Sequence, residues 1–176
     1  MKKMLTFIAV AVLATASIHA ASVTWQATGL KDDKGVALNG AVAYLFNTAD
    51  VSISDVKSAL ENKKFSSSMA SKAIATKATN GTGAITLTKI GNYSNETVEL
   101  FMIVFDKDAV STSPNYMVSS TVSQTFTTTN KSYNFNTALS SSSWAKNAEY
   151  VPVPEPCTVA LLALGLVAVG MKRKVA

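Results

Sequence analysis

The residue types that most often perform catalysis are confined to the two ends of this chain. Its one histidine is His19, its one cysteine is Cys157 and its one arginine is Arg173. Residues 21–156 therefore supply no imidazole for general base catalysis or zinc binding, no thiol nucleophile and no guanidinium to hold an anion. A single cysteine also excludes a disulfide within the chain. The sequence predicts a protein that is not an enzyme and that needs no cofactor or metal.

The carboxylates of the central region do not have the spacing of a catalytic pair. Glu96 and Glu99 have opposite parity along an extended strand, so they point to opposite faces. Asp106 and Asp108 stand at the end of an apolar run, where calcium could find oxygen ligands, but the glycine and bidentate glutamate of a calcium loop are missing. A solvated strand end is the expected interpretation. A hydrolase that uses only carboxylates would need two acidic side chains about 5–10 Å apart in one cleft.

Two tryptophans are candidates for sugar contacts. Trp25 alternates with polar neighbours, which favours a place in the core. Trp144, within "SSSSWAKN", has no periodic context and is the better candidate for an exposed, sugar-contacting ring. Tyr116 and Tyr133 either flank it or pack in the core, since amphipathic aromatic side chains also occur at sheet edges.

The net charge of +5 does not indicate a nucleic-acid-binding surface. Five of the 16 basic residues lie in the terminal segments: Lys2, Lys3, Lys172, Arg173 and Lys174. The 11 that remain equal the 11 acidic residues, all of which lie between the two ends. A charge-balanced body has no basic stripe for phosphates, so nucleic acid is excluded as a partner.

The first residues have the layout of a secretory signal peptide. Lys2 and Lys3 precede an apolar run that reaches about Ala16, and small residues follow, so that cleavage after Ala20 or Ser22 is expected. A retained membrane anchor is the alternative, but the run is too short to cross about 30 Å of hydrocarbon. We therefore predict a signal peptide, in helical form, over residues 1–21.

The body reads as short strands with one helix. Ser52 and Asp55 have the spacing of a capping box before an apolar stripe with helical periodicity. Residues 65–79 are compatible with an edge strand, a short helix or a loop, and "NGTG" at 80–83 indicates a turn. The expected strands are 23–28, 41–47, 84–90, 97–106, 115–123 and 132–138.

These elements predict an all-β fold, an antiparallel β-sandwich of immunoglobulin-like or jelly-roll-like type, over residues 22–146. The run Leu100–Phe105 is the most apolar and is expected to be the central strand. Strands 84–90 and 97–106 are expected to pair as an antiparallel hairpin around "GNYSNE". Residues 147–153 read as a linker.

The chain ends in a short apolar span between prolines and a basic cluster. Cys157–Met171 contains no charge and as a helix would measure about 22 Å, which is short for a bilayer. Pro154 and Pro156 prevent the helix from extending toward the body. Lys172, Arg173 and Lys174 are the charges expected to stay on the cytoplasmic side. An ordinary single-span anchor is the alternative to a signal that an enzyme recognises.

Val153-Pro154-Glu155-Pro156 with Thr158, the apolar span and the basic end resemble the PEP-CTERM sorting signal of exported bacterial proteins. The resemblance covers about 24 residues and implies recognition at Pro154, Glu155 and Pro156 by exosortase, a membrane-embedded cysteine transpeptidase. It also implies a short transmembrane helix within residues 154–176. Cys157 stands where the family more often has a small residue, so lipidation or crosslinking there is an alternative to simple packing.

Together these patterns predict an exported, non-enzymatic protein of the cell surface or extracellular matrix. The expected partners are the general secretion machinery and exosortase, with exopolysaccharide or other surface glycans as further candidates. The membrane would hold the tail before processing. A secreted carbohydrate-binding or adhesion module is the alternative function.

Overall fold

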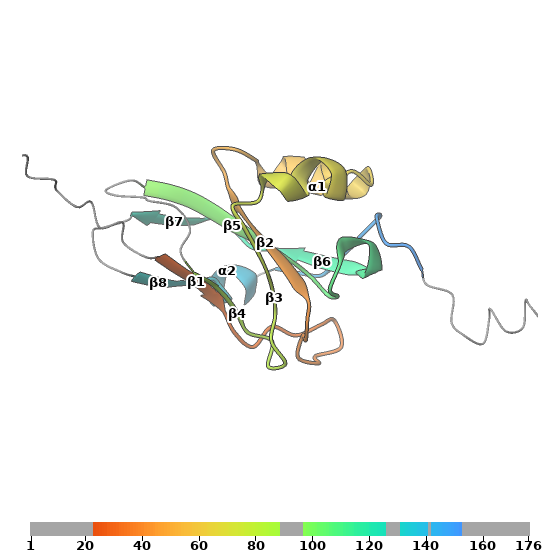
Figure 1. Cartoon of the computed structure of the whole chain (residues 1–176), viewed down its shortest axis with the longest axis horizontal. Helices are drawn as coiled ribbons and strands as arrows, with labels where there is room; N and C mark the ends of the chain where they lie inside the picture. The colour runs from red at the N-terminus through yellow and green to blue at the C-terminus, as the bar shows by residue number, and fades with distance from the viewer. Residues whose placement is uncertain (1–22, 89–96, 126–130, 141, 153–176) are drawn as a thin grey trace, which may run out of the picture.

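A computed structural model describes residues 23–88, 97–125, 131–140 and 142–152. Figure 1 shows three layers: helix α1 on one side of a large sheet and a small sheet on the other. The predicted signal peptide, the predicted transmembrane helix and the sorting motif lie outside the described residues. Within the described part, no helix is both long and apolar enough to cross a membrane.

The large sheet has the strand order β3-β2-β5-β6-β9, and β7 pairs with β5 off this path. All its pairs are antiparallel. Its strands are β2 (Val42–Asn47), β3 (Ala75–Ala78), β5 (Thr97–Phe105), β6 (Asn115–Val118), β7 (Val122–Thr125) and β9 (Ala145–Lys146). The predicted central position of Leu100–Phe105 is confirmed, because β5 pairs with β2 on one side and with β6 and β7 on the other.

The small sheet has the order β4-β1-β8. Its strands are β1 (Val23–Ala27), β4 (Ile85–Thr88) and β8 (Lys131–Asn134). β1 runs antiparallel to β4 but parallel to β8. The all-β class is confirmed. The wholly antiparallel arrangement is wrong at β1–β8, and the immunoglobulin-like or jelly-roll-like type stays a prediction.

Strand β5 contributes to both cores of the molecule. Its side chains at 100, 102 and 104 join the core between the two sheets, which also contains Trp25 and Phe135. Its side chains at 101, 103 and 105 join the core beneath α1. Every side chain from Leu100 to Phe105 has no exposed surface, which explains why this strand reads as an uninterrupted apolar run.

Helix α1 (Ile53–Glu61) begins at the predicted capping box. The Ser52 Oγ accepts a hydrogen bond from the Asp55 backbone N–H at 3.1 Å, and the Ser52 N–H donates to the Asp55 carboxylate at 3.2 Å. The apolar stripe of α1 packs on the large sheet through Val56, Ala59 and Leu60. These two bonds satisfy backbone groups that the first turn would otherwise leave unpaired.

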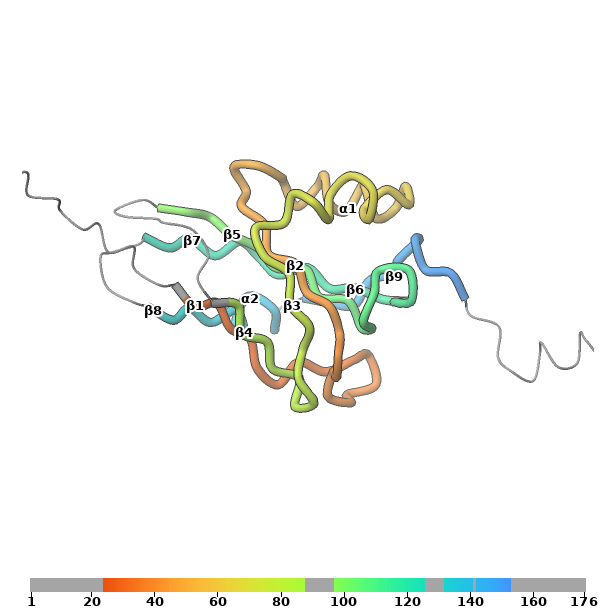
Figure 2. Tube along the Cα trace, viewed as in Figure 1, coloured from red at the N-terminus to blue at the C-terminus, as the bar shows by residue number. Residues whose placement is uncertain are grey.

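Residues 65–79 contain all three of the forms left open by the sequence. A π-helical turn, η1 (Phe65–Met69), leads into a 3₁₀ turn, η2 (Ala70–Lys72), and then into the edge strand β3. Phe65 is fully buried against the aromatic residues of the helix-facing core. The segment therefore returns the chain from α1 to the edge of the large sheet (Figure 2).

Three strand predictions are corrected. β4 and β5 belong to different sheets and do not form the expected hairpin; the segment that joins them, residues 89–96, lies outside the described residues. Residues 115–123 form two strands rather than one, because the pairing with β5 shifts by one residue between Val118 and Val122. In this interval the Ser119 side chain accepts a hydrogen bond from the Met102 N–H at 2.8 Å. Residues 136–138 belong to a second helix, α2 (Asn136–Ser140), rather than to a strand.

The predicted turn at 80–83 is confirmed, and it makes close contact with the loop after β1. The Asn80 Oδ1 accepts from the Thr82 and Ala84 N–H groups, and the Leu30 N–H donates to the Gly83 carbonyl at 3.0 Å. Gly83 has a φ of +70°, and a Cβ there would collide with the Leu30 backbone. Only glycine fits where the 80–83 turn approaches the backbone of the loop after β1.

Gly83→Ala should lower the free energy of unfolding by about 2 kcal/mol or more, because it adds a left-handed backbone penalty to a clash with rigid backbone atoms. Gly81→Ala is the matched control. The φ of Gly81 lies outside the left-handed region, and a Cβ added there would first meet the Asn39 side chain, at 3.9 Å. Chemical denaturation of both variants measures the difference. Equal losses would contradict the close contact at Gly83.

Candidate functional site

The candidate site is the junction between the β domain and the C-terminal tail. The structure describes the chain up to Pro152. The predicted motif residues, Val153, Pro154, Glu155, Pro156 and Thr158, lie outside the described residues, as do Lys172, Arg173 and Lys174. What the structure describes is how the domain holds the chain immediately before them.

Asn147 is the main attachment of this segment. It is 6% exposed, and its Nδ2 donates to the carbonyls of Val110 at 2.6 Å and Ser113 at 2.8 Å. Its own N–H donates to the Pro114 carbonyl at 3.0 Å, and its Oδ1 accepts from the Glu149 N–H at 3.0 Å. A single side chain therefore fastens the segment to the 3₁₀ turn η3 (Val110–Thr112).

Glu149 and Val151 extend the attachment toward the tail. The Glu149 carboxylate accepts from the Ser66 N–H at 3.1 and 3.2 Å and from the Ser66 Oγ at 2.6 Å, which joins the segment to η1. The Val151 N–H donates to the Ser111 carbonyl at 2.9 Å. We name residues 145–151, from β9 to this last bond, the strap. The predicted linker at 147–153 is thus bonded to the domain through Val151.

The strap is held by polar contacts rather than by the hydrophobic cores. Of the residues that the structure describes, none after Trp144 belongs to either core cluster. Val151 is 64% exposed, and Ala145 and Lys146 are exposed on the two-residue edge strand β9. The Lys146 Nζ donates to the Asn115 Oδ1 at 2.8 Å. Because few apolar contacts hold it, the strap belongs to the least stable part of the fold.

Trp144 is half-buried, not the exposed ring predicted from the sequence. It packs against the core between the sheets, because side chains of an extended segment alternate between its two sides and this one faces inward. Of the two alternatives for Tyr116 and Tyr133, packing in the cores is the one that the structure shows. Tyr133 stacks on Trp25 with ring centroids 4.8 Å apart, and Tyr116 lies in the other core.

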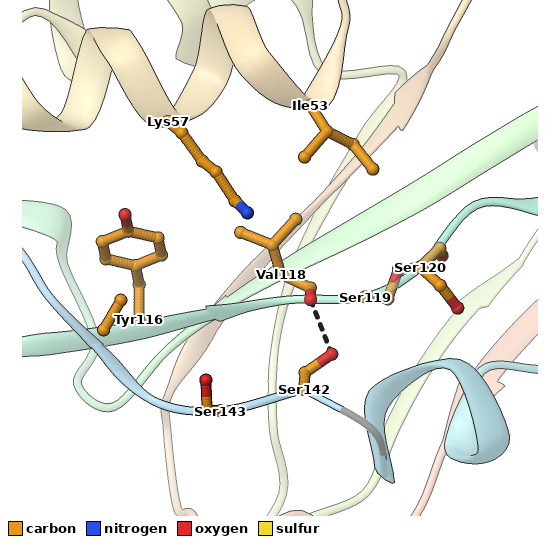
Figure 3. Close-up of a pocket in the computed structure, with 9 residues that line it drawn as sticks. Ile53, Lys57, Tyr116, Val118, Ser119, Ser120, Ser142 and Ser143 are labelled. Atoms are coloured by element: carbon orange, nitrogen blue, oxygen red, sulfur yellow. Dashed lines mark hydrogen bonds between the residues drawn. The ribbon is translucent and has the colours of Figure 1, made fainter.

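Two hollows border the segment that leads into the strap. One, of about 310 Å³, has Trp144, Asn136 and Lys31 in its lining. The other, of about 380 Å³, lies between α1 and β6, and Figure 3 shows Lys57 extending from α1 toward Val118 and Tyr116 standing beside it. Its remaining lining includes Ser119, Ser120, Ser142 and Ser143. We call this second hollow the hydroxyl groove.

Burial acts on two tyrosines near the junction. Burial raises the pKa of Tyr116, and the Glu61 carboxylate adds to the rise. Burial likewise raises the pKa of Tyr44, with Glu149 of the strap as the second cause. Since a phenol ordinarily loses its proton near pH 10, both tyrosines stay neutral and serve as hydrogen-bonding and packing groups.

The acidic side chains at the end of β5 are engaged within the protein. The Asp106 carboxylate accepts from the Asn115 Nδ2 at 2.8 Å, and the Asp108 carboxylate accepts from the Thr112 Oγ1 at 3.0 Å. Among the described residues, no three His, Cys, Asp or Glu side chains come together as metal ligands. Glu99 is exposed on β5, and Glu96 lies outside the described residues.

The described β domain thus fastens the segment that leads directly into the proline-flanked tail. The model of the PEP-CTERM protein-sorting motif matches residues 152–174. The chain therefore carries a PEP-CTERM protein-sorting motif. The motif implies export, processing by an exosortase and transient anchoring in a membrane through the C-terminal tail. No curated protein and no solved structure matches the chain.

The matched residues begin one position after the last bond of the strap. Sequence reasoning found the motif but missed the roles of Asn147 and Glu149. The available signal was local: an asparagine side chain that accepts from the backbone N–H two residues on is a common turn former. Its long-range partners at Val110 and Ser113 carry no sequence pattern.

Asn147→Ala should loosen the strap while the core keeps its stability. The variant loses three side-chain hydrogen bonds, two to the Val110 and Ser113 carbonyls and one from the Glu149 N–H, so amide exchange at positions 147 and 151 should rise by about tenfold or more. Hydrogen exchange followed by mass spectrometry measures this, with Asn62→Ala on the surface of α1 as the matched control. An equal rise across β5 would show instead that the strap unfolds only with the core.

Proposed function

We propose that this protein is a non-enzymatic component of the cell surface or extracellular matrix, delivered there after exosortase processing of its C-terminal tail. The observation that carries the proposal is the PEP-CTERM motif at 152–174, which directly follows the bonded strap of a β domain. The predicted signal peptide at residues 1–21 supports delivery through the general secretion machinery.

The composition of the domain supports a structural or binding role over a catalytic one. Histidine, cysteine and arginine occur only at His19, Cys157 and Arg173, so the domain relies on hydroxyls, amides, lysines and carboxylates for its surface chemistry. Of these carboxylates, Glu149 and Asp106 already accept hydrogen bonds within the fold. Such a surface suits contact with other hydrated polymers of the envelope.

Replacing the tripeptide by alanines (Pro154→Ala, Glu155→Ala and Pro156→Ala together) should block processing. The full-length precursor should then accumulate in the membrane fraction, because the recognised residues are gone while the apolar span remains. Immunoblotting of membrane and released fractions, with intact-mass analysis of the product, gives the measurement. Glu99→Ala, at an exposed site on β5, is the control for substitution alone. Unchanged release of the triple variant would contradict exosortase sorting.

Binding of surface glycans, including exopolysaccharide, is the second candidate function. The hydroxyl groove favours it: about 380 Å³ is within the range of small-molecule sites, and its lining combines Lys57 with hydroxyl groups. The Ser119 and Ser142 hydroxyls are occupied by the Ser120 and Val118 carbonyls. The Ser143 hydroxyl borders the same groove from the opposite side to α1. The Lys57 ammonium and the Ser143 hydroxyl are groups that can form hydrogen bonds with the hydroxyls of a saccharide.

A glycan array probed with the processed protein tests this candidate, and the two hollows make different predictions. Lys57→Ala should weaken retention by about tenfold or more if the hydroxyl groove binds the sugar, since a hydrogen bond to a charged group contributes about 1.5–3 kcal/mol. Trp144→Ala should do so if the other hollow binds it. Lys77→Ala on β3 is the control. An array with no retained glycan would remove the candidate.

A further inference from the structure

The bonded strap leaves very little free chain between the domain and the sorting tripeptide. The last described attachment is the Val151 N–H to the Ser111 carbonyl at 2.9 Å. Pro154 follows three residues later in the sequence. A fully extended chain spans at most about 3.3–3.6 Å per residue, so the tripeptide begins within about 10 Å of the domain.

This short tether conflicts with the place where the tail is processed. The tail anchors in the membrane through the apolar run that begins at Cys157, directly after the tripeptide. The charge-free apolar run favours the hydrocarbon core of the membrane. The prolines before it place its first residues at the membrane surface. An enzyme that binds the tripeptide at the membrane surface needs space on all sides of it. The folded domain, with its stacked sheets and helix, begins within about 10 Å of the tripeptide.

We propose that the strap detaches from the domain so that the tripeptide can reach the processing site, and that its release sets the rate of processing. Detachment of residues 145–151 adds about seven residues, or roughly 25 Å, to the reach of the tail. The inference rests on exosortase processing, as proposed above. It adds that the folded domain itself controls access to its own sorting signal.

The contacts of the strap suit such a release. It pairs with the sheet only through the two residues of β9, at the outer edge next to β6. Lys146, Asn147 and Glu149 supply the side-chain contacts, and every one of these bonds can be replaced by water. Since the described part of the chain contributes no residue after Trp144 to the cores, detachment from Ala145 onward removes no residue from either core cluster.

A reversible crosslink tests the inference directly. Ser111 and Val151 are both exposed and their backbones are joined by one hydrogen bond, so cysteines at these positions lie within disulfide reach. Ser111→Cys with Val151→Cys, in a Cys157→Ser background, should form the bond after export. In the full-length protein this crosslink should slow processing by about tenfold or more. Reduction, or Val151→Cys alone, should leave the rate at that of the background.

Two further variants separate a tether effect from misfolding. An insertion of about eight Gly and Ser residues between Pro152 and Val153 supplies about 26 Å of reach and should restore processing of the crosslinked protein. Asn147→Ala should accelerate processing by about tenfold, because it weakens the strap; Asn62→Ala should not. The comparison of Asn147→Ala with Asn62→Ala tests strap release even if the crosslink forms incompletely.

The outcomes distinguish the two proposals. Processing of the crosslinked protein at the background rate would overturn strap release, as would failure of the insertion to rescue it or an unchanged rate for Asn147→Ala. Precursor accumulation after alanine replacement of Pro154–Pro156, measured in parallel, still supports exosortase sorting in that case. Normal processing of that alanine variant would instead overturn the proposed function.

Discussion

Burial of β5 on both faces is the constraint on which the rest of the structure depends. Its even-numbered side chains from Leu100 to Val104 need the small sheet as a cover, and its odd-numbered ones from Phe101 to Phe105 need α1. A strand with no polar face cannot be stable in a single sheet exposed to water. The chain must therefore build a layer on each side, although its remaining strands are short. Function is left to the surface and to the chain ends.

Local signals predicted the elements, and non-local pairing decided the fold. The capping box at Ser52 and Asp55 and the apolar run of β5 act within a few residues, so the sequence alone identified them. The partners of β4 were not predictable in this way: its neighbour along the chain is β5, but it pairs with β1, more than fifty residues earlier. Apolar alternation says which face is buried and does not say which strand lies beside it.

One part of the candidate site is visible in the local sequence, and the other part depends on long-range contacts. The tail motif is a contiguous pattern that the sequence displays by itself, whereas the strap depends on contacts such as Glu149 with Ser66, which are separated by 83 positions. A polar stretch before a tail resembles a linker when it is considered alone. The exposure of Trp144 was not predictable for a related reason: which side of the segment before β9 faces the core is decided by tertiary packing.

The parallel pairing of β1 with β8 constrains the order in which the molecule is completed. Val23 and Lys131 are partners in this pair, and next to it Thr28 and Asn136 bond across 108 positions. The first strand of the body therefore waits for one of the last, and such distant pairings form slowly. The small sheet cannot close until residue 134 is available to pair. The fold is therefore completed only once most of the chain is present.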